Sequence, residues 1–118
     1  MIEKIIFDFL TEALRPTPVH METPDKSPQT TPSKWVLIEK TSSAQSNKIN
    51  TATIAIQSYA ASLYEAAELN EDVKAAMLND DGLISLDAVF GVSLNADYNF
   101  TDTTKKKYRY QAVFDINF

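Results

Sequence analysis

Residues 53–73 read TIAIQSYAASLYEAAELNEDV, and within this stretch the spacing of the apolar side chains changes from two residues to about 3.6. In its first part apolar and polar residues alternate, with Ile54 and Ile56 on one side, which is typical of a half-buried strand. After Ser62 the apolar residues follow helical spacing. Ser62 with Glu65 three positions later is the pattern of a capped helix N-terminus. The sequence therefore predicts a strand that leads directly into an amphipathic helix.

The same two periods predict the other elements. A stripe of isoleucine, phenylalanine and leucine at helical spacing predicts a helix over Ile2–Leu14, which Pro16 ends. Alternation and β-branched or aromatic content predict the strands. These strands are expected at 19–22, 35–40, 49–57, 89–98 and 107–118. Residues 41–48 and 99–106 are then the turns of two hairpins.

The resulting order, α-β-β-β-α-β-β, predicts an α+β fold in a single domain over residues 1–118. Each long strand has one apolar and one polar face, so we expect an antiparallel or mixed sheet of about four to five strands with two helices packed on one face. In the strand at 89–98 one face is expected to carry Phe90, Val92, Leu94, Ala96 and Tyr98. In the last strand one face is expected to carry Tyr108, Tyr110, Ala112, Phe114, Ile116 and Phe118.

Composition narrows the classes of function. The chain has no cysteine, so neither a disulfide framework nor a thiolate metal site is possible. A net charge of −5 disfavours a dedicated nucleic-acid binder, because neutralising phosphates requires clustered cations. No apolar run approaches the roughly 20 residues of a membrane-spanning helix, so no membrane partner is expected.

Two polar loops are candidate interaction segments. All five prolines lie between positions 16 and 32, and residues 23–34 form a proline-rich polar loop. Residues 99–107, the turn before the last strand, end in three lysines. The candidate interface residues in and beside these loops are Asp25, Lys26, Gln29, Thr30, Asp102, Lys105, Lys106, Lys107 and Arg109.

Some residue types in this chain are catalytic or ligand-binding in other proteins, but here they can also be explained by structural roles. His20 is the only histidine, and a general base needs a nucleophile and an orienting partner that the sequence does not supply, so an exposed or packing role is favoured. The lysine run fits nucleic-acid contact, protection of a sheet edge, or docking to an acidic partner. A stripe of aromatic residues fits base stacking or a half-buried sheet face, and its members are Tyr98, Tyr108, Tyr110, Phe114 and Phe118. No catalytic residue, cofactor or metal site is predicted.

Several phrases of the sequence resemble one protein family. They are WVLIEKTSS at 35–43, IQSYA at 56–60, AAELN at 66–70, NADYNFTD at 95–102 and YRYQ at 108–111. With their surroundings they are similar to small proteins encoded in the head–tail gene cluster of long-tailed phages and prophages of Gram-positive bacteria. These proteins are identified as tail terminator, or tail completion, proteins. The proline-rich segment at 23–34 matches least.

The resemblance implies a structural virion protein and no enzymatic activity. Terminator proteins form a hexameric ring that caps the tail tube, stops polymerisation of the major tail protein and presents a surface to the head-completion or neck protein. This implies a place at the head–tail interface of the virion, after assembly in the host cytoplasm, with DNA only as passing cargo and no cofactor. Two alternatives stay open: a head-closure or head–tail joining protein of the same gene cluster, and a small non-viral adaptor domain.

Overall fold

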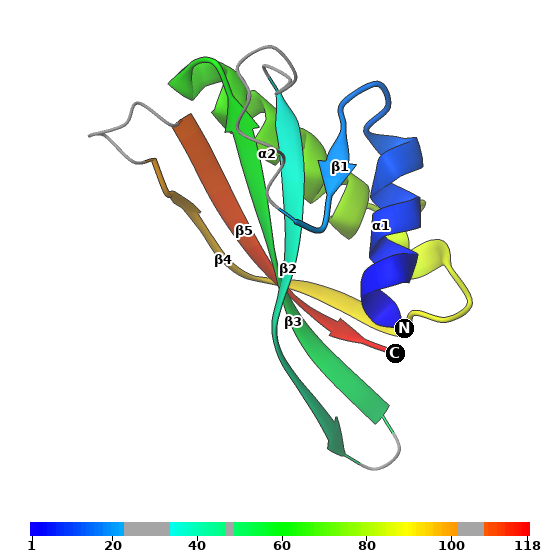
Figure 1. The fold of residues 1–118 in the computed structure, drawn as a ribbon. Helices are drawn as coiled ribbons and strands as arrows, with labels where there is room; N and C mark the ends of the chain where they lie inside the picture. Colours follow the sequence, from blue (N-terminus) through cyan, green and yellow to red (C-terminus); the bar gives the residue numbers. More distant parts are fainter. Residues whose placement is uncertain (23–33, 47–48, 102–107) are drawn as a thin grey trace.

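The computed structural model describes residues 1–22, 34–46, 49–101 and 108–118. Five strands form one sheet in the order β1-β2-β3-β5-β4 (Figure 1). The strands are β1 Val19–His20, β2 Trp35–Ser46, β3 Ile49–Ala60, β4 Gly91–Asn99 and β5 Tyr108–Asn117. The helices are α1 Ile2–Ala13 and α2 Leu63–Leu78, and a short 3₁₀ helix, η1 Leu83–Ser85, follows α2.

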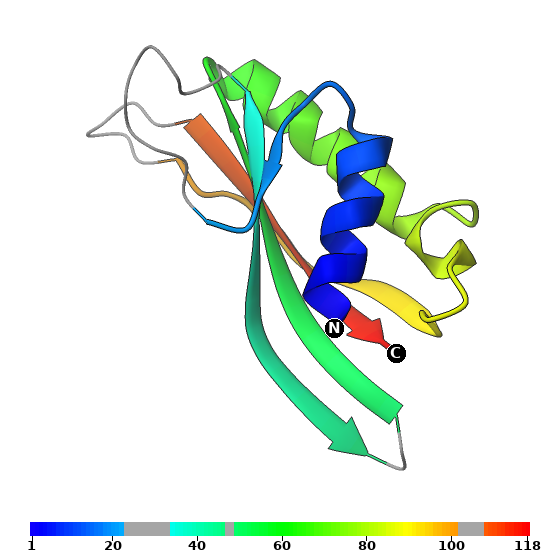
Figure 2. The same ribbon diagram turned by 45° about the vertical axis from the view of Figure 1, so that its right-hand side comes forward.

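Both α-helices lie on the same face of the sheet, as Figure 2 shows most clearly. The short strand β1 pairs in parallel with β2, whereas the β2–β3, β3–β5 and β4–β5 pairs are antiparallel. The sheet is therefore mixed. This confirms the predicted α+β fold with about five strands and two helices on one face.

The junction between β3 and α2 forms where the hydrophobic period changes. Ser62 has an extended backbone, and its Oγ accepts a hydrogen bond from the N–H of Glu65 at 3.2 Å. This bond satisfies one of the N–H groups that an α-helix leaves unpaired at its start. The predicted helix start is thus confirmed, and α2 ends at Leu78, one residue before its C-cap Asn79.

The core lies between the helices and the sheet. Each α-helix contributes residues three or four positions apart, and each central strand contributes alternate residues, as the two periods require. The largest fully buried side chains include Ile6, Leu10, Ile54, Ile56, Leu69, Val73, Met77, Phe114 and Ile116. The predicted buried face of β5 is confirmed, because Ala112, Phe114 and Ile116 are all fully buried.

The predicted turn at 41–48 is wrong over most of its length. Strand β2 continues through Ser46 and pairs with β3, after a bulge between Lys40 and Ser42. Backbone pairing to β3 holds this hydroxyl-rich segment in the sheet, and Thr41 Oγ1 donates to the carbonyl of Thr53 at 3.1 Å. The β2–β3 hairpin consequently extends past the helices, in a molecule of 46 × 26 × 24 Å (Figures 1 and 2).

The predicted faces of β4 are correct only in its first half. Val92 and Leu94 point toward the helix side, but the register shifts between Leu94 and Ala96. Ala96 and Tyr98 therefore pair with residues of β5 that point away from the helices. The prediction that they share a face with Leu94 is wrong, because the extra residue Asn95 makes a β-bulge that reverses the alternation.

Candidate interaction surface on the sheet

One face of the sheet has no described helix against it, and we call it the uncovered face. It carries alternate residues of each strand, which cross-strand pairing brings side by side. Trp35 of β2 lies opposite Tyr59 of β3, and Tyr59 in turn lies opposite Arg109 of β5. The sequence pattern predicted that this face is polar. In the structure it is only partly so, because large aromatic side chains lie at its β1–β2 end and along β4.

Trp35 is a largely buried aromatic residue of this face. Its ring stacks on Tyr59 with 3.9 Å between the centroids and 3° between the planes, and His20 meets it edge-on at 5.9 Å. Only 8% of Trp35 is exposed. Aromatic pairs of this kind contribute about 0.5–1.5 kcal/mol beyond the area they bury. His20 thus packs against Trp35, which is one of the two roles, exposed or packing, expected for it.

Arg109 joins this stack to the edge of the sheet. Its Nη1 donates to Tyr59 Oη at 3.2 Å, and its Nε donates to the carbonyl of Phe100 at 2.7 Å. The guanidinium carbon also lies 4.2 Å from the centroid of the Phe100 ring, which is a cation–π distance. Among the described residues Arg109 forms no ion pair with a carboxylate. Within the part of the chain that the structure describes, its position is held by aromatic rings and neutral acceptors, and no carboxylate neutralises its charge.

A chain of side-chain hydrogen bonds crosses the same face. Tyr59 Oη donates to Gln57 Oε1 at 2.6 Å, and Gln57 Nε2 donates to Gln111 Oε1 at 2.9 Å. Gln111 Nε2 then donates to Tyr98 Oη. Each amide has its orientation set by its neighbours, and a connected network of this kind is more rigid than separate polar residues.

The exposed end of this arrangement lies on and just after β4. Tyr98 is 42% exposed and Phe100 is 38% exposed, and their rings meet edge-on at 5.8 Å. We call the whole set the aromatic–amide cluster; its members are His20, Trp35, Gln57, Tyr59, Tyr98, Phe100, Arg109 and Gln111. It passes from buried side chains at β2 to exposed ones at β4, so a partner would meet the Tyr98–Phe100 end first.

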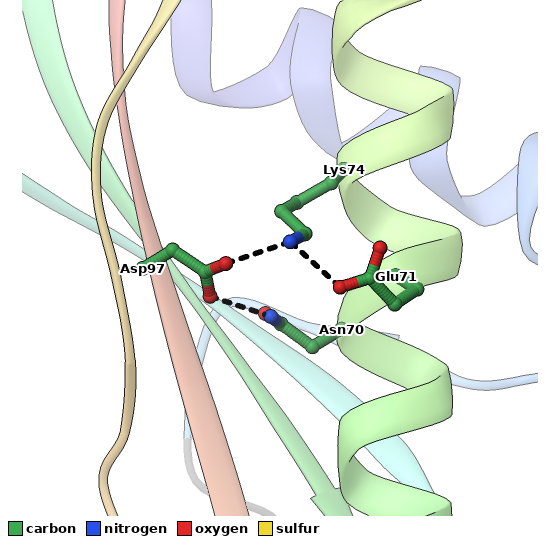
Figure 3. A network of polar contacts seen from close by, with 4 residues as sticks. All are labelled: Asn70, Glu71, Lys74 and Asp97. Atoms are coloured by element: carbon green, nitrogen blue, oxygen red, sulfur yellow. Dashed lines mark hydrogen bonds and ion pairs between the residues drawn. The ribbon is translucent and has the colours of Figure 1, made fainter.

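A second polar network lies on the helix side and connects α2 to β4 (Figure 3). Asp97 accepts from Asn70 Nδ2 at 2.7 Å and from Lys74 Nζ at 2.6 Å, and Lys74 also pairs with Glu71 at 2.7 Å. The hydrogen bonds from Lys74 to Asp97 and Glu71 raise the pKa of the lysine. We interpret this network as a structural connection, because its charges are satisfied within the molecule.

The structure locates only one of the predicted interface residues. Arg109 lies in the centre of the aromatic–amide cluster, as described above. The other predicted positions fall outside the described residues: Asp25, Lys26, Gln29, Thr30, Asp102, Lys105, Lys106 and Lys107.

Most of the cluster was not predicted from the sequence. The predicted alternation placed Tyr98 on one face with Val92 and Leu94, and no pairing of Trp35 with Tyr59 was predicted. Counting outward from the β2–β3 turn would place position 35 opposite position 60, and only the bulge between Lys40 and Ser42 shifts the register so that Trp35 lies opposite Tyr59.

Other features of the described residues suggest no further chemistry. They contain no group of three or more side chains suited to hold a metal ion. An open groove of about 560 Å³ lies between the end of α1 and the end of α2, with Arg15, Lys34, Asp72 and Asp81 among its lining residues. Across the part of the chain that the structure describes, no helix is both long and apolar enough to cross a membrane.

The fold and surface together define a class: a small α+β domain with one sheet face that no described helix covers. Neither the comparison with protein-family models nor that with curated proteins finds a match for this chain.

Proposed function

We propose that this protein is a tail terminator of a long-tailed phage or prophage, which caps the tail tube as a ring and provides the surface for head attachment. The sequence phrases described above suggest this family. The observation that carries the proposal on the structural side is the aromatic–amide cluster, which is a preorganised surface on the uncovered face of the sheet.

The composition of this cluster suits a protein partner. Tryptophan, tyrosine and arginine are the residues that most often dominate binding energy at protein interfaces. Here Arg109 is already positioned by Tyr59 and Phe100, so little side-chain freedom is lost when a partner binds. In this proposal the exposed rings of Tyr98 and Phe100 pack on the last ring of the tail tube, and Arg109 pairs with one of its carboxylates.

Capping by such a ring needs no bond-making step. The ring ends polymerisation because its tail-facing surface matches the growing end of the tube, whereas its opposite surface does not accept another subunit of the major tail protein. Complementarity of shape and charge therefore provides the function.

The test is to polymerise the major tail protein in the presence of this protein and to measure tube lengths by electron microscopy. We expect tubes of limited length with a ring at one tip. Arg109→Ala should give longer and more variable tubes, because it removes the charge and the cation–π contact at the centre of the cluster. Lys4→Ala is the matched control, because Lys4 pairs with Asp8 on the exposed side of α1, so its loss should leave capping intact.

Circular dichroism must show that both variants are folded. Tubes that reach the same lengths with and without the wild-type protein, and that carry no ring, would exclude the terminator function. Rings that instead bind to isolated heads would favour the head-closure alternative.

A further inference from the structure

The sheet has two long edges without a strand partner among the described residues. Strand β4 is last in the sheet order, so one side of Gly91–Asn99 is unpaired. On the other side of the sheet, β1 pairs with β2 only at Val36 and Leu37. The remainder of β2, residues 38–46, therefore has an unpaired side too. Each edge presents a row of backbone N–H and C=O groups, which are the groups that bind another strand.

Apolar side chains on and beside the β4 edge are exposed to solvent in the single chain. Phe90, just before β4, and Leu94 in it are 68% and 41% exposed, and neither belongs to the aromatic–amide cluster proposed to meet the tail tube. The single charge in this segment, Asp97, is turned toward α2 and neutralised by Lys74. Proline and lysine, which commonly protect sheet edges, do not occur in residues 90–101. An edge of this kind is typical of a site that a partner covers.

The β2 edge is complementary to it. Residues 41–45 read TSSAQ, and these side chains are short or neutral. Lys40, the nearest cation, is tied to Glu3 of α1 at 3.3 Å. Short side chains on one strand leave room for large ones on the strand beside it, and the two edges have the same length, because residues 38–46 and 91–99 each comprise nine positions.

We propose that the β4 edge of one copy pairs with the residue 38–46 edge of β2 in the next copy, so that the sheet continues from subunit to subunit. The inference rests on the proposed function, because it assumes the ring of identical subunits proposed there. A closed ring requires head-to-tail contacts between two different patches on each subunit, and these two edges provide such a pair. Backbone hydrogen bonds supply affinity in this kind of contact, and the side chains select the partner strand.

The absence of cysteine from the chain makes disulfide trapping a clean test. One cysteine is placed in β4 by Ser93→Cys and a second in β2 by Ser42→Cys, Ser43→Cys or Ala44→Cys, which covers neighbouring registers. Each double variant is oxidised mildly, both alone at high concentration and on tubes of the major tail protein. At least one should form a ladder of covalent multimers on a non-reducing gel, because paired strands bring their Cα atoms within disulfide distance of about 4.4–6.8 Å.

The controls separate this arrangement from others. Each single variant should give no ladder, and Ser93→Cys combined with Glu12→Cys on the exposed side of α1 should give none either. Efficient disulfide dimers from Ser93→Cys alone would show that β4 pairs with β4 of a second copy, which overturns the head-to-tail proposal. The further change Leu94→Lys in a ladder-forming variant should reduce the ladder several-fold, because it places a charge on the β4 edge.

Failure of this inference is distinguishable from failure of the proposed function. Absence of a ladder from every double variant, while rings still cap the tubes, would overturn edge pairing and leave the terminator function standing. A ladder formed by protein that does not limit tube length would support edge pairing and exclude the terminator function. Absence of both would overturn both.

Discussion

Gly82 leaves little room for substitution, because backbone atoms surround it closely. It lies in the turn between α2 and η1, and a Cβ built on it would be 2.1 Å from the carbonyl oxygen of Ala76 and 3.0 Å from that of Asn79. Its φ of −87° is negative, and the structure leaves no space for a Cβ at this position. Both obstacles are backbone atoms, which cannot move without displacing the end of α2.

Replacing Gly82 by alanine should therefore lower the free energy of unfolding by about 1–3 kcal/mol, the usual cost of forcing atoms into a packed site. The matched control is Gly91→Ala, whose Cβ would lie 3.0 Å from Nδ2 of Asn117, a side-chain atom that can rotate away. Urea denaturation of the two variants measures the difference. Equal destabilisation by both substitutions would contradict the argument.

At the scale of elements, the contact between α2 and the edge strand β4 depends on charge as well as packing. Asp97 is the only acidic residue of β4, and it receives hydrogen bonds from Asn70 and Lys74 of α2. The pKa of Lys74 is raised in the folded protein by its hydrogen bonds to Asp97 and Glu71. A raised folded-state pKa means that protonated Lys74 stabilises the fold.

The sign of the pH dependence follows from this shift. The stabilisation is complete below the pKa of lysine in the unfolded chain, about 10.4, and is lost as the pH rises through the higher pKa of the folded state. Lys74→Met should thus cost about 1 kcal/mol between pH 7 and 9, and the difference from wild type should shrink above about pH 10.5. Urea denaturation across this range measures it.

Lys4→Met provides the control for a general charge effect. The Lys4–Asp8 pair is exposed on α1, so its removal should change stability by less than about 0.5 kcal/mol at any of these pH values. A cost of Lys74→Met that stayed constant up to pH 11.5 would show that the methylene stem, and not the charge, connects α2 to β4.

On the scale of the whole molecule, one hydrophobic core contains buried residues of β1, β2, β3, β5, both α-helices and η1. Strand β4 packs against this core through Val92. The single tryptophan, Trp35, lies on the opposite face of the sheet and reports on that face. Since the sheet is common to both sides, unfolding of the uncovered face and of the helix layer should be one event.

We expect tryptophan fluorescence and far-ultraviolet circular dichroism to give coincident urea transitions. Ile54→Val, which removes one methyl group from the fully buried centre of β3, should shift both transitions equally, by about 0.5–1.5 kcal/mol. Two separate transitions, or a shift in only one probe, would indicate that the uncovered face unfolds independently.

The sequence by itself determined the features that depend on neighbours along the chain. Helix α1, the β3–α2 junction at Ser62 and the buried face of β5 all follow from local periodicity and capping, because the identity of the next few residues decides them. Arg109 could be selected as a candidate interface residue from the sequence, since charge on a strand beside a polar loop is visible without a structure; its role at an interface stays a prediction.

Tertiary structure alone decided the rest. Each of the bulges in β2 and β4 inserts one residue that has no partner on the neighbouring strand, and no residue type in the sequence marks that position. The bulge at Asn95 turns Tyr98 onto the uncovered face and Asp97 toward Lys74, which creates the exposed end of the aromatic–amide cluster and the α2–β4 connection together. The two-residue period of the sequence predicts that side chains of β4 alternate between the two faces of the sheet. Only the pairing of β4 with β5 determines the position at which this alternation reverses.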